Sequence, residues 1–283
     1  MPYGICILMT YKEGTADLGN GLKVFYRTWM PEKSRGTIIG VHGFVEHTGR
    51  YVEFGKYLES NGYTLAMYDL RGHGRTASAD EFGYVKSFET LVTDTEAFSS
   101  YVMDVMGSES VFLLGHSMGG LIVFHVLARS KVPVRGAVTS GASLGVVSSG
   151  GQRAMLSIIN AISPRKRVKL PIHAEYLSHD PAIGENYLKD TLVCKNPSVS
   201  LIYQLYQGSR NIWKDLGKVS SPVLMLQGSD DKIVPPSVTP QAYESISSTD
   251  KTKKMYDGFY HEILNERGKE AVYSDILEWL SAH

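Results

Sequence analysis

A serine between two glycines follows an apolar run near the middle of the chain. Residues 115–119 (GHSMG) fit the pattern G-x-S-x-G, with the apolar residues 111–114 before them and a second apolar run, 121–128, after them. A buried strand, a sharp turn and a buried helix are the surroundings in which a strained turn lifts a nucleophilic serine above a sheet. The flanking glycines suit such a turn, because a side chain at either position would collide with neighbouring backbone. The sequence therefore predicts that Ser117 is a catalytic nucleophile.

A serine hydroxyl is a weak nucleophile and needs a histidine base, which in turn needs an acid to orient it. In hydrolases with this turn, the acid and then the histidine follow the serine, each in a loop after a later strand. One strand-like run ends just before Asp230 and Asp231, and a shorter one ends before a loop that holds His261. We expect His261 to act as general base and then general acid, and Asp231 to orient its imidazole, with Asp230 as the alternative acid.

The tetrahedral intermediate of acyl transfer needs N–H donors that point at its oxyanion. One donor is expected to be the backbone N–H of Met118, directly after the nucleophile. The other is expected from the loop after the strand-like residues 37–41, where the sequence continues with His42, Gly43 and Phe44. We nominate the N–H of Phe44, because a backbone donor is compatible with almost any side chain.

Several segments resemble those of one enzyme family. Residues 42–51 (HGFVEHTGRY) resemble the HGxxEHxxRY segment of monoglyceride lipases, which belong to the α/β-hydrolase superfamily. Residues 69–74 (DLRGHG) are similar to the D-x-RGHG-x-S turn of the same group, although Arg75 and Thr76 stand where the family closes this turn with serine. Further segments match in the same order, namely 115–120, 228–231 and 258–266. The resemblance covers roughly residues 20–280 and indicates a monoglyceride lipase or lysophospholipase-like protein.

The resemblance also implies residues that bind the substrate. In the family, the segment that holds Glu46 and Arg50 and a tyrosine of the cap contact the glycerol end of the substrate. Residues 187–193 (YLKDTLV) are similar to the family's Y-x-x-D-P-L-[IV] segment, with Thr191 in place of proline, so we nominate Tyr187. For Glu46 and Arg50 the alternative role is an ion pair that braces the oxyanion loop.

Strand-like and helix-like segments alternate along most of the chain. Alternating apolar residues over 21–29 predict an antiparallel edge strand, and helical spacing predicts helices over 51–60 and 88–106, the second ended by Gly107. Such alternation implies a mostly parallel central sheet flanked by helices, with ligands at the carboxyl ends of the strands. Together with the resemblance, it predicts an α/β-hydrolase fold with a helical cap (lid) insertion.

The alternation breaks over residues 143–219, a stretch too long for an ordinary loop. We expect a hydrolase core formed by residues 1–142 and 220–283, with 143–219 as a helical cap over the nucleophile. A fatty acyl chain gains about 0.8 kcal/mol per buried methylene, so an apolar tunnel under this cap would hold a long chain firmly.

One predicted cap helix carries an apolar face formed by Met155, Ile158, Ile159 and Ile162, and a basic run over 165–169 follows it. In one interpretation this face packs on the core and the charges are solvated. In the other, the helix touches a lipid surface and the basic run favours anionic headgroups. Any such membrane contact would be peripheral and reversible.

Composition excludes other classes of protein. The 29 basic and 29 acidic residues of the 283-residue chain give a formal net charge of zero. The chain therefore has no excess of positive charge that would attract nucleic acid. Two cysteines suggest no disulfide framework, and no apolar run approaches the ~20 residues of a membrane span. The N-terminal residues lack the basic start of a signal peptide. We therefore expect a cytoplasmic protein, with the cap as its candidate for membrane contact.

The predicted reaction is hydrolysis of a monoacylglycerol, or a similar single-chain ester, to fatty acid and glycerol through an acyl-enzyme. This reaction requires neither a metal nor a cofactor. The serine at position 117 argues against a dehalogenase, which would carry aspartate there. A lysophospholipase or a general short- to medium-chain carboxylesterase is the main alternative. A non-catalytic binding protein with this fold is a remote one, because nucleophile, acid, histidine and oxyanion loop are all present.

Overall fold

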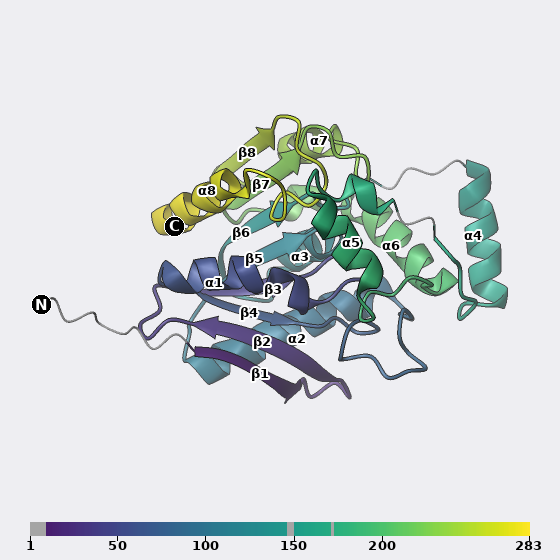
Figure 1. Cartoon of the computed structure of the whole chain (residues 1–283), viewed down its shortest axis with the longest axis horizontal. Coiled ribbons are helices and arrows are strands. Elements are labelled where there is room, and N and C mark those ends of the chain that lie inside the picture. The colour runs from purple at the N-terminus through teal and green to yellow at the C-terminus, as the bar shows by residue number, and fades with distance from the viewer. Residues whose placement is uncertain (1–9, 146–149, 171–172) are drawn as a thin grey trace, which may run out of the picture.

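One eight-stranded sheet runs through the molecule (Figure 1). The computed structural model describes residues 10–145, 150–170 and 173–283. Within them the strands lie in the order β1-β2-β4-β3-β5-β6-β7-β8. Their bounds are β1 (Thr10–Asp17), β2 (Lys23–Met30), β3 (Thr37–Val41), β4 (Thr64–Tyr68), β5 (Val111–His116), β6 (Val134–Ser140), β7 (Val223–Gly228) and β8 (Lys251–Tyr256). The two pairings made by β2 are antiparallel and the others are parallel, as in the α/β-hydrolase fold.

The prediction of an edge strand over residues 21–29 is wrong in one respect. β2 corresponds to this predicted strand and its pairings are antiparallel. However, β1 pairs with β2 from Thr10↔Met30 to Asp17↔Lys23, so β1 and not β2 forms the edge of the sheet. The sequence of β1, TYKEGTAD, has no apolar alternation, and most of its side chains are exposed. Backbone hydrogen bonds hold this strand, and they leave no signal in the hydrophobic pattern.

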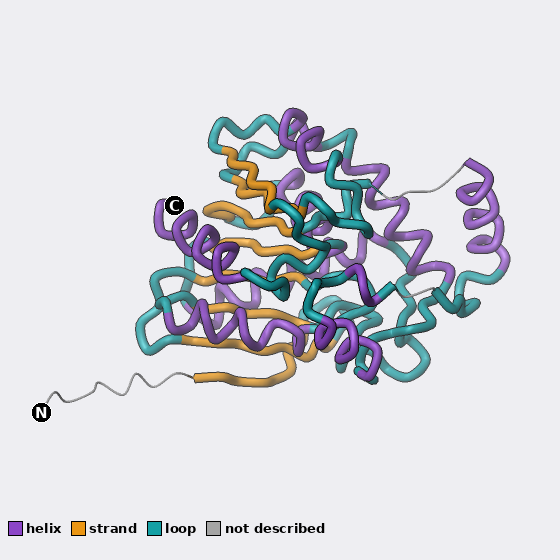
Figure 2. Tube along the Cα trace, turned by 45° about the horizontal axis from the view of Figure 1, so that its top comes forward, coloured by secondary structure: helices purple, strands orange, loops and turns teal. Residues whose placement is uncertain are grey.

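Helices cover both faces of the sheet (Figure 2). The α-helices of the described residues are α1 (Val52–Ser60), α2 (Phe88–Met106), α3 (Met118–Arg129), α4 (Gly150–Ile162), α5 (Pro181–Lys189), α6 (Val199–Ile212), α7 (Val238–Ser245) and α8 (Lys269–Ala282). Successive residues of β3 point to opposite faces. Ile38 packs in a buried cluster with Ile276 of α8, and Ile39 packs in another with Leu121 of α3. The sheet is therefore the middle layer of three.

Local signals explain the bounds of α2, which match the predicted helix over 88–106. The hydroxyl of Ser87 accepts a hydrogen bond from the N–H of Glu89 at the start of the helix. Gly107 follows the last turn with φ of 62°, a left-handed conformation that glycine adopts at no steric penalty. A polar N-cap and a C-terminal glycine are signals that can be found in a sequence.

Most described residues of 143–219 are helical or irregular, and an isolated bridge between Arg167 and Ser198 is their only β-pairing. α5 and α6 lie above the carboxyl ends of the central strands, and α4 stands apart at the margin of the molecule beside α6 (Figure 1). Within the described residues, no helix combines the length and the apolar character that crossing a bilayer requires.

The predicted apolar face of α4 does not pack on the core. The side chains of Met155, Ile158 and Ile162 are 58%, 60% and 77% exposed. Two residues of the basic run after α4 have partners in the core. Arg165 forms an ion pair with Glu81, and Arg167 donates a hydrogen bond to a backbone carbonyl of the same loop.

Candidate active site

Ser117 occupies a sharp turn between β5 and α3. Its φ of 53° and ψ of −117° are unusual for a residue with a side chain, and this strain is what a nucleophile elbow stores. A Cβ at Gly119 would collide with the carbonyl of Val41, and a Cβ at Gly115 would collide with the backbone of Gly119. The spacing of the two glycines therefore has the steric cause expected from the sequence.

His261 and Asp231 meet at the carboxyl ends of neighbouring strands. His261 follows β8, Asp231 follows β7, and the distance from His261 Nδ1 to Asp231 Oδ2 is 2.7 Å. Asp231 Oδ1 accepts hydrogen bonds from the N–H groups of Ile233 (2.8 Å) and Val234 (2.9 Å), which hold the carboxylate in place. Asp230 is exposed, and its side chain bonds to the neighbouring serine hydroxyl. The structure therefore places Asp231, and not Asp230, against the imidazole.

The electrostatics of this pair favour an imidazole that accepts a proton. Burial alone would lower the pKa of His261, but Asp231, Glu262 and Glu46 outweigh it and raise that pKa above its usual range. Burial would raise the pKa of Asp231, but His261 and the two N–H donors lower it. Because Nδ1 bonds to a carboxylate, Nε2 is the nitrogen left to take a proton from a nucleophile.

The hydroxyl of Ser117 has a partner that the sequence analysis missed. Its Oγ lies 3.1 Å from Ser143 Oγ, and the N–H of Ser143 donates to the carbonyl of Ser117 (3.0 Å). Within the described residues, Ser117 Oγ makes no hydrogen bond to His261. Both residues nevertheless line one cavity of about 110 Å³. Ser143 lies just past the carboxyl end of β6, next to β5, and this position in the topology is the signal that could have found it.

The two predicted oxyanion donors, Phe44 and Met118, belong to the two turns that adjoin Ser117. Met118 is the first residue of α3, and N–H groups in the first turn of a helix have no partner within the helix. Phe44 lies in the turn after β3 and lines the same cavity as Ser117. The turn is held from beneath by His42: its Nε2 accepts from the N–H of Leu70 (2.9 Å), so its Nδ1 donates to the carbonyl of Gly43 (2.8 Å).

Glu46 and Arg50 form an ion pair that continues to the histidine loop. Arg50 Nη1 lies 2.5 Å from Glu46 Oε2 and 2.6 Å from Glu262 Oε1, and Arg50 Nη2 lies 2.8 Å from Glu262 Oε2. Glu46 Oε1 also accepts from the N–H of Gly43 (2.5 Å). The guanidinium therefore joins the turn after β3 that holds Gly43 and Phe44, here called the oxyanion turn, to Glu262, the residue after His261. These contacts hold the oxyanion turn and the histidine loop together, and we call the three side chains the brace. Direct contact of Glu46 or Arg50 with substrate stays a prediction.

The three side chains of the brace, Glu46, Arg50 and Glu262, are buried. The side chains of Glu46 and Glu262 are each 4% exposed, and that of Arg50 is 11% exposed. Burial alone would raise the pKa of Glu46, but Arg50 and the neighbouring His116 and His42 lower it to about 2. Burial also lowers the pKa of His116 to about 4, so this ring beside His261 is neutral at pH 7.

Tyr187 of α5 is the predicted cap residue nearest the brace. Its side chain is buried and lines the cavity of Ser117, and the guanidinium carbon of Arg50 lies 4.8 Å from the centre of its ring. Two contacts that the sequence did not indicate tie the cap to the oxyanion turn. His47 Nε2 lies 2.7 Å from Asp190 Oδ2, and the N–H of Cys194 donates to the carbonyl of Val45 (2.9 Å).

Known proteins resemble this chain over most of its length. The family model described as serine aminopeptidase, S33, matches residues 32–268. Human monoglyceride lipase is 31% identical over 270 residues, which cover 93% of this chain and 88% of that protein. The phospholipase YtpA of Bacillus subtilis is 27% identical over 252 residues, covering 87% of this chain and 95% of that protein.

A solved structure has the same fold as this chain. The crystal structure of a monoacylglycerol lipase from Paleococcus ferrophilus matches with a TM-score of 0.83 and 27% identity, over 92% of this chain and 99% of that chain. The family match and the human relative each extend over most of the chain. This protein belongs to the monoglyceride lipase-like family of α/β-hydrolases and is a carboxylic ester hydrolase.

Proposed function

We propose that this protein hydrolyses monoacylglycerols to fatty acid and glycerol, with Ser117, His261 and Asp231 as its catalytic triad. The observation that carries the proposal is the 2.7 Å contact between His261 and Asp231 at the cavity that also exposes the strained Ser117. Nucleophile, base and orienting acid thus come from three loops at the carboxyl ends of the strands. A catalytic triad is recognised by such geometry and by the roles of its residues, not by their positions in the sequence.

In the first half of the reaction, Ser117 Oγ turns from Ser143 toward His261 Nε2 and attacks the ester carbonyl carbon as the imidazole takes its proton. The resulting oxyanion accepts hydrogen bonds from the N–H groups of Phe44 and Met118. Each such donor typically contributes about 3–4 kcal/mol of transition-state stabilisation. The C–O bond to the alcohol then breaks, and the imidazolium protonates the departing glycerol.

In the second half, His261 takes a proton from water, which attacks the carbonyl carbon of the acyl-enzyme. The second tetrahedral intermediate then collapses, the bond to Ser117 Oγ breaks, and the imidazolium returns its proton to that oxygen as the fatty acid leaves. Asp231 stays ionised throughout and stabilises the imidazolium of both steps. The raised pKa of His261 and the lowered pKa of Asp231 fit these roles.

The size and lining of the catalytic cavity support glycerol as the leaving group. One water molecule occupies about 30 Å³ of liquid, so a cavity of about 110 Å³ suits a group of the size of a small polyol. Tyr187, Arg50 and Glu262 line it and can bond to hydroxyl groups. Polar groups of this kind reject an alcohol that lacks the hydroxyls far better than an apolar wall does.

A lysophospholipid is the second candidate substrate, because the phospholipase YtpA is similar to this chain over almost its whole length. The exposed apolar side chains of α4 support peripheral contact with a lipid surface, from which either substrate would be drawn. The net charge of zero offers nucleic acid no attraction. Cytoplasmic localisation remains a prediction from the sequence.

A serine-directed fluorophosphonate tests the nucleophile. The wild-type protein should be labelled under native conditions and Ser117→Ala should not, and an unlabelled wild type would refute the proposed site. Asp231→Asn should lower kcat by several powers of ten, whereas Asp230→Asn, its matched control, should leave kcat within about twofold. Initial rates on monooctanoylglycerol, a lysophospholipid and p-nitrophenyl butyrate then decide the substrate class. A higher kcat/KM for the lysophospholipid would replace monoacylglycerol.

A further inference from the structure

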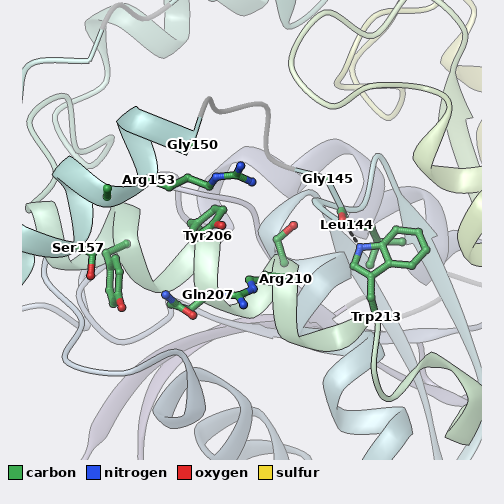
Figure 3. Close-up of a pocket in the computed structure, with 12 residues that line it drawn as sticks. Leu144, Gly145, Gly150, Arg153, Ser157, Tyr206, Gln207, Arg210 and Trp213 are labelled. Atoms are coloured by element: carbon green, nitrogen blue, oxygen red, sulfur yellow. Dashed lines mark hydrogen bonds between the residues drawn. The ribbon is translucent and has the colours of Figure 1, made fainter.

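The cap meets the catalytic cavity through the residues before α5 and not through α4. A cavity of about 790 Å³ lies between α4 and α6 (Figure 3), and none of the described residues that line it also lines the cavity of Ser117. Residues 174–180, here called the cap segment, lie instead against the loop that holds His261. The N–H of Glu262 donates to the carbonyl of Leu177 (2.8 Å), and Leu177 also lines the cavity of Ser117.

Glu266 ends the histidine loop, and the proposed reaction assigns it no role. It is only 3% exposed, and its two carboxylate oxygens accept hydrogen bonds from both segments. Oε1 accepts from the N–H of His179 (2.8 Å), the N–H of Arg267 (2.8 Å) and the hydroxyl of Ser178 (3.0 Å). Oε2 accepts from Nδ1 of His179 (3.0 Å) and from the N–H of Tyr260 (3.2 Å).

The charge of Glu266 is compensated by these donors. Burial alone would raise its pKa, but the N–H of Arg267 and the two donors of His179 outweigh burial and lower that pKa below its usual range. Glu266 is therefore a carboxylate at pH 7. A buried polar group whose partners are all in place makes its surroundings rigid. The carboxylate thus joins the cap segment to Tyr260, the residue directly before His261.

The ring of Tyr260 is held as well as its backbone. It stacks on His179 of the cap segment, with 3.7 Å between the ring centres. On the other side, the ammonium group of Lys232, the residue after Asp231, lies 4.4 Å from the centre of this ring and 5.0 Å from that of Tyr176. The acid loop, the histidine loop and the cap segment therefore meet at Tyr260.

We propose that Glu266 is a positioning residue, which holds the backbone at Tyr260 so that the imidazole of His261 stays directed at Ser117. It touches neither substrate nor the reacting atoms and acts through the residue before His261. The inference rests on the proposed function, because it assigns to Glu266 the placement of the base in that reaction.

Glu266→Gln keeps the shape of the side chain but leaves one accepting oxygen in place of two. Oε1 faces three donors and Oε2 faces two, so the amide oxygen should take the place of Oε1. The amide NH2 then meets His179 and Tyr260. The ring of His179 can change its tautomer and accept, but the N–H of Tyr260 cannot, so the backbone before His261 loses its partner.

For monooctanoylglycerol, kcat of Glu266→Gln should fall about tenfold to a hundredfold, and KM should stay within about twofold of wild type. Counting kcat per active site, from the endpoint of fluorophosphonate labelling, removes any contribution of unfolded protein. The acid limb of kcat/KM against pH should keep its midpoint, because Asp231, Glu262 and Glu46 chiefly raise the pKa of His261. A kcat per site within twofold of wild type, a loss confined to KM, or a shifted midpoint would overturn the inference.

Glu266→Asp is the second variant, should Glu266→Gln fail to fold. It keeps the charge but withdraws it by one methylene, so kcat should fall at least about threefold with KM kept, and an unchanged kcat would overturn the inference. Ser178→Ala removes a donor on the cap side and leaves the N–H of Tyr260 bonded. Its kcat should fall no more than about threefold, and a loss as large as that of Glu266→Gln would overturn the assignment to Tyr260.

Two matched controls change the same chemical groups elsewhere. Glu278→Gln lies on the exposed face of α8 and Ser157→Ala on that of α4, and both should keep kcat within about twofold. Failure of the proposed function would be seen in wild type, as no labelling or no hydrolysis of monooctanoylglycerol. If wild type hydrolyses only p-nitrophenyl butyrate, the substrate class is replaced, and the same comparison of kcat on that ester still decides the role of Glu266.

Discussion

Replacing Arg50 by methionine removes the one cation between two buried carboxylates. Arg50 donates three hydrogen bonds of 2.5 to 2.8 Å to Glu46 and Glu262, whose side chains are each only 4% exposed. Removing one partner of a buried ion pair typically destabilises a protein by about 3–5 kcal/mol, because the remaining charge is left without compensation. Here two like charges remain, so we expect a loss near 5 kcal/mol at pH 7 and a fall in Tm of roughly 10 °C or more.

The pKa of Glu46 determines how the loss of stability depends on pH. In wild type the pKa of Glu46 is lowered to about 2 from an ordinary value of 4.5. The stability that this shift contributes is fully present above pH 4.5 and is lost as pH falls toward 2. In Arg50→Met the neighbouring carboxylate and burial raise that pKa instead. One carboxyl is then protonated more easily, and the variant should lose less stability at pH 5 than at pH 7.

Urea denaturation of wild type and variant at pH 5 and pH 7 measures both quantities, with CD as the probe. The double variant Arg50→Met/Glu262→Gln leaves a single buried carboxylate and should regain about half of the loss. A free energy of unfolding within about 1 kcal/mol of wild type would refute the assignment of Arg50 as a buried brace, because exposed ion pairs have that value. An equal loss at both pH values would refute the coupling of the two carboxylates.

Three further predictions concern the catalytic loops. Glu262→Gln removes a carboxylate that raises the pKa of His261, so the acid limb of the profile of kcat/KM against pH should lie at lower pH in the variant than in wild type; an unchanged or higher midpoint would contradict this. Ser143→Ala removes the hydrogen bond that holds the Ser117 hydroxyl in its resting position, so fluorophosphonate labelling should be about fivefold faster, and slower labelling would make Ser143 an assistant in the reaction. Gly119→Ala places a methyl group against backbone and should lower the free energy of unfolding by about 3 kcal/mol in urea titrations, and a variant as stable as wild type would argue against this elbow geometry.

The local parts of the site could be predicted from the sequence because each has a local cause. The G-x-S-x-G turn has steric requirements that only glycine meets, and the order of nucleophile, acid and histidine follows from the order of strands. The end of α2 was likewise visible in Gly107. The sequence analysis favoured Asp231 but kept Asp230 as the alternative acid, because adjacent residues share their local signals and differ only in where the loop after β7 directs them.

The contacts between distant segments could not be predicted, for the same physical reason in each case. Glu262 meets Arg50 across 212 positions, and His47 meets Asp190 across 143. Nothing in the composition of either segment specifies the other. The exposure of the apolar face of α4 was also out of reach, because its helical spacing is the same whether the helix packs on a core or faces solvent.

Polar contacts fasten one end of the cap to the core more tightly than the other. His47 with Asp190, and Cys194 with Val45, fasten the end that holds α5 to the turn after β3. A buried polar contact adds little net stability compared with apolar packing, so the value of such contacts lies in fixing geometry. At the other end, α4 contacts the remainder of the described chain chiefly through α6 and has no buried residue. The geometry around the cavity of Ser117 is therefore fixed by contacts that α4 lacks, and substitutions on the exposed face of α4 should disturb the catalytic loops less than substitutions at His47 or Asp190.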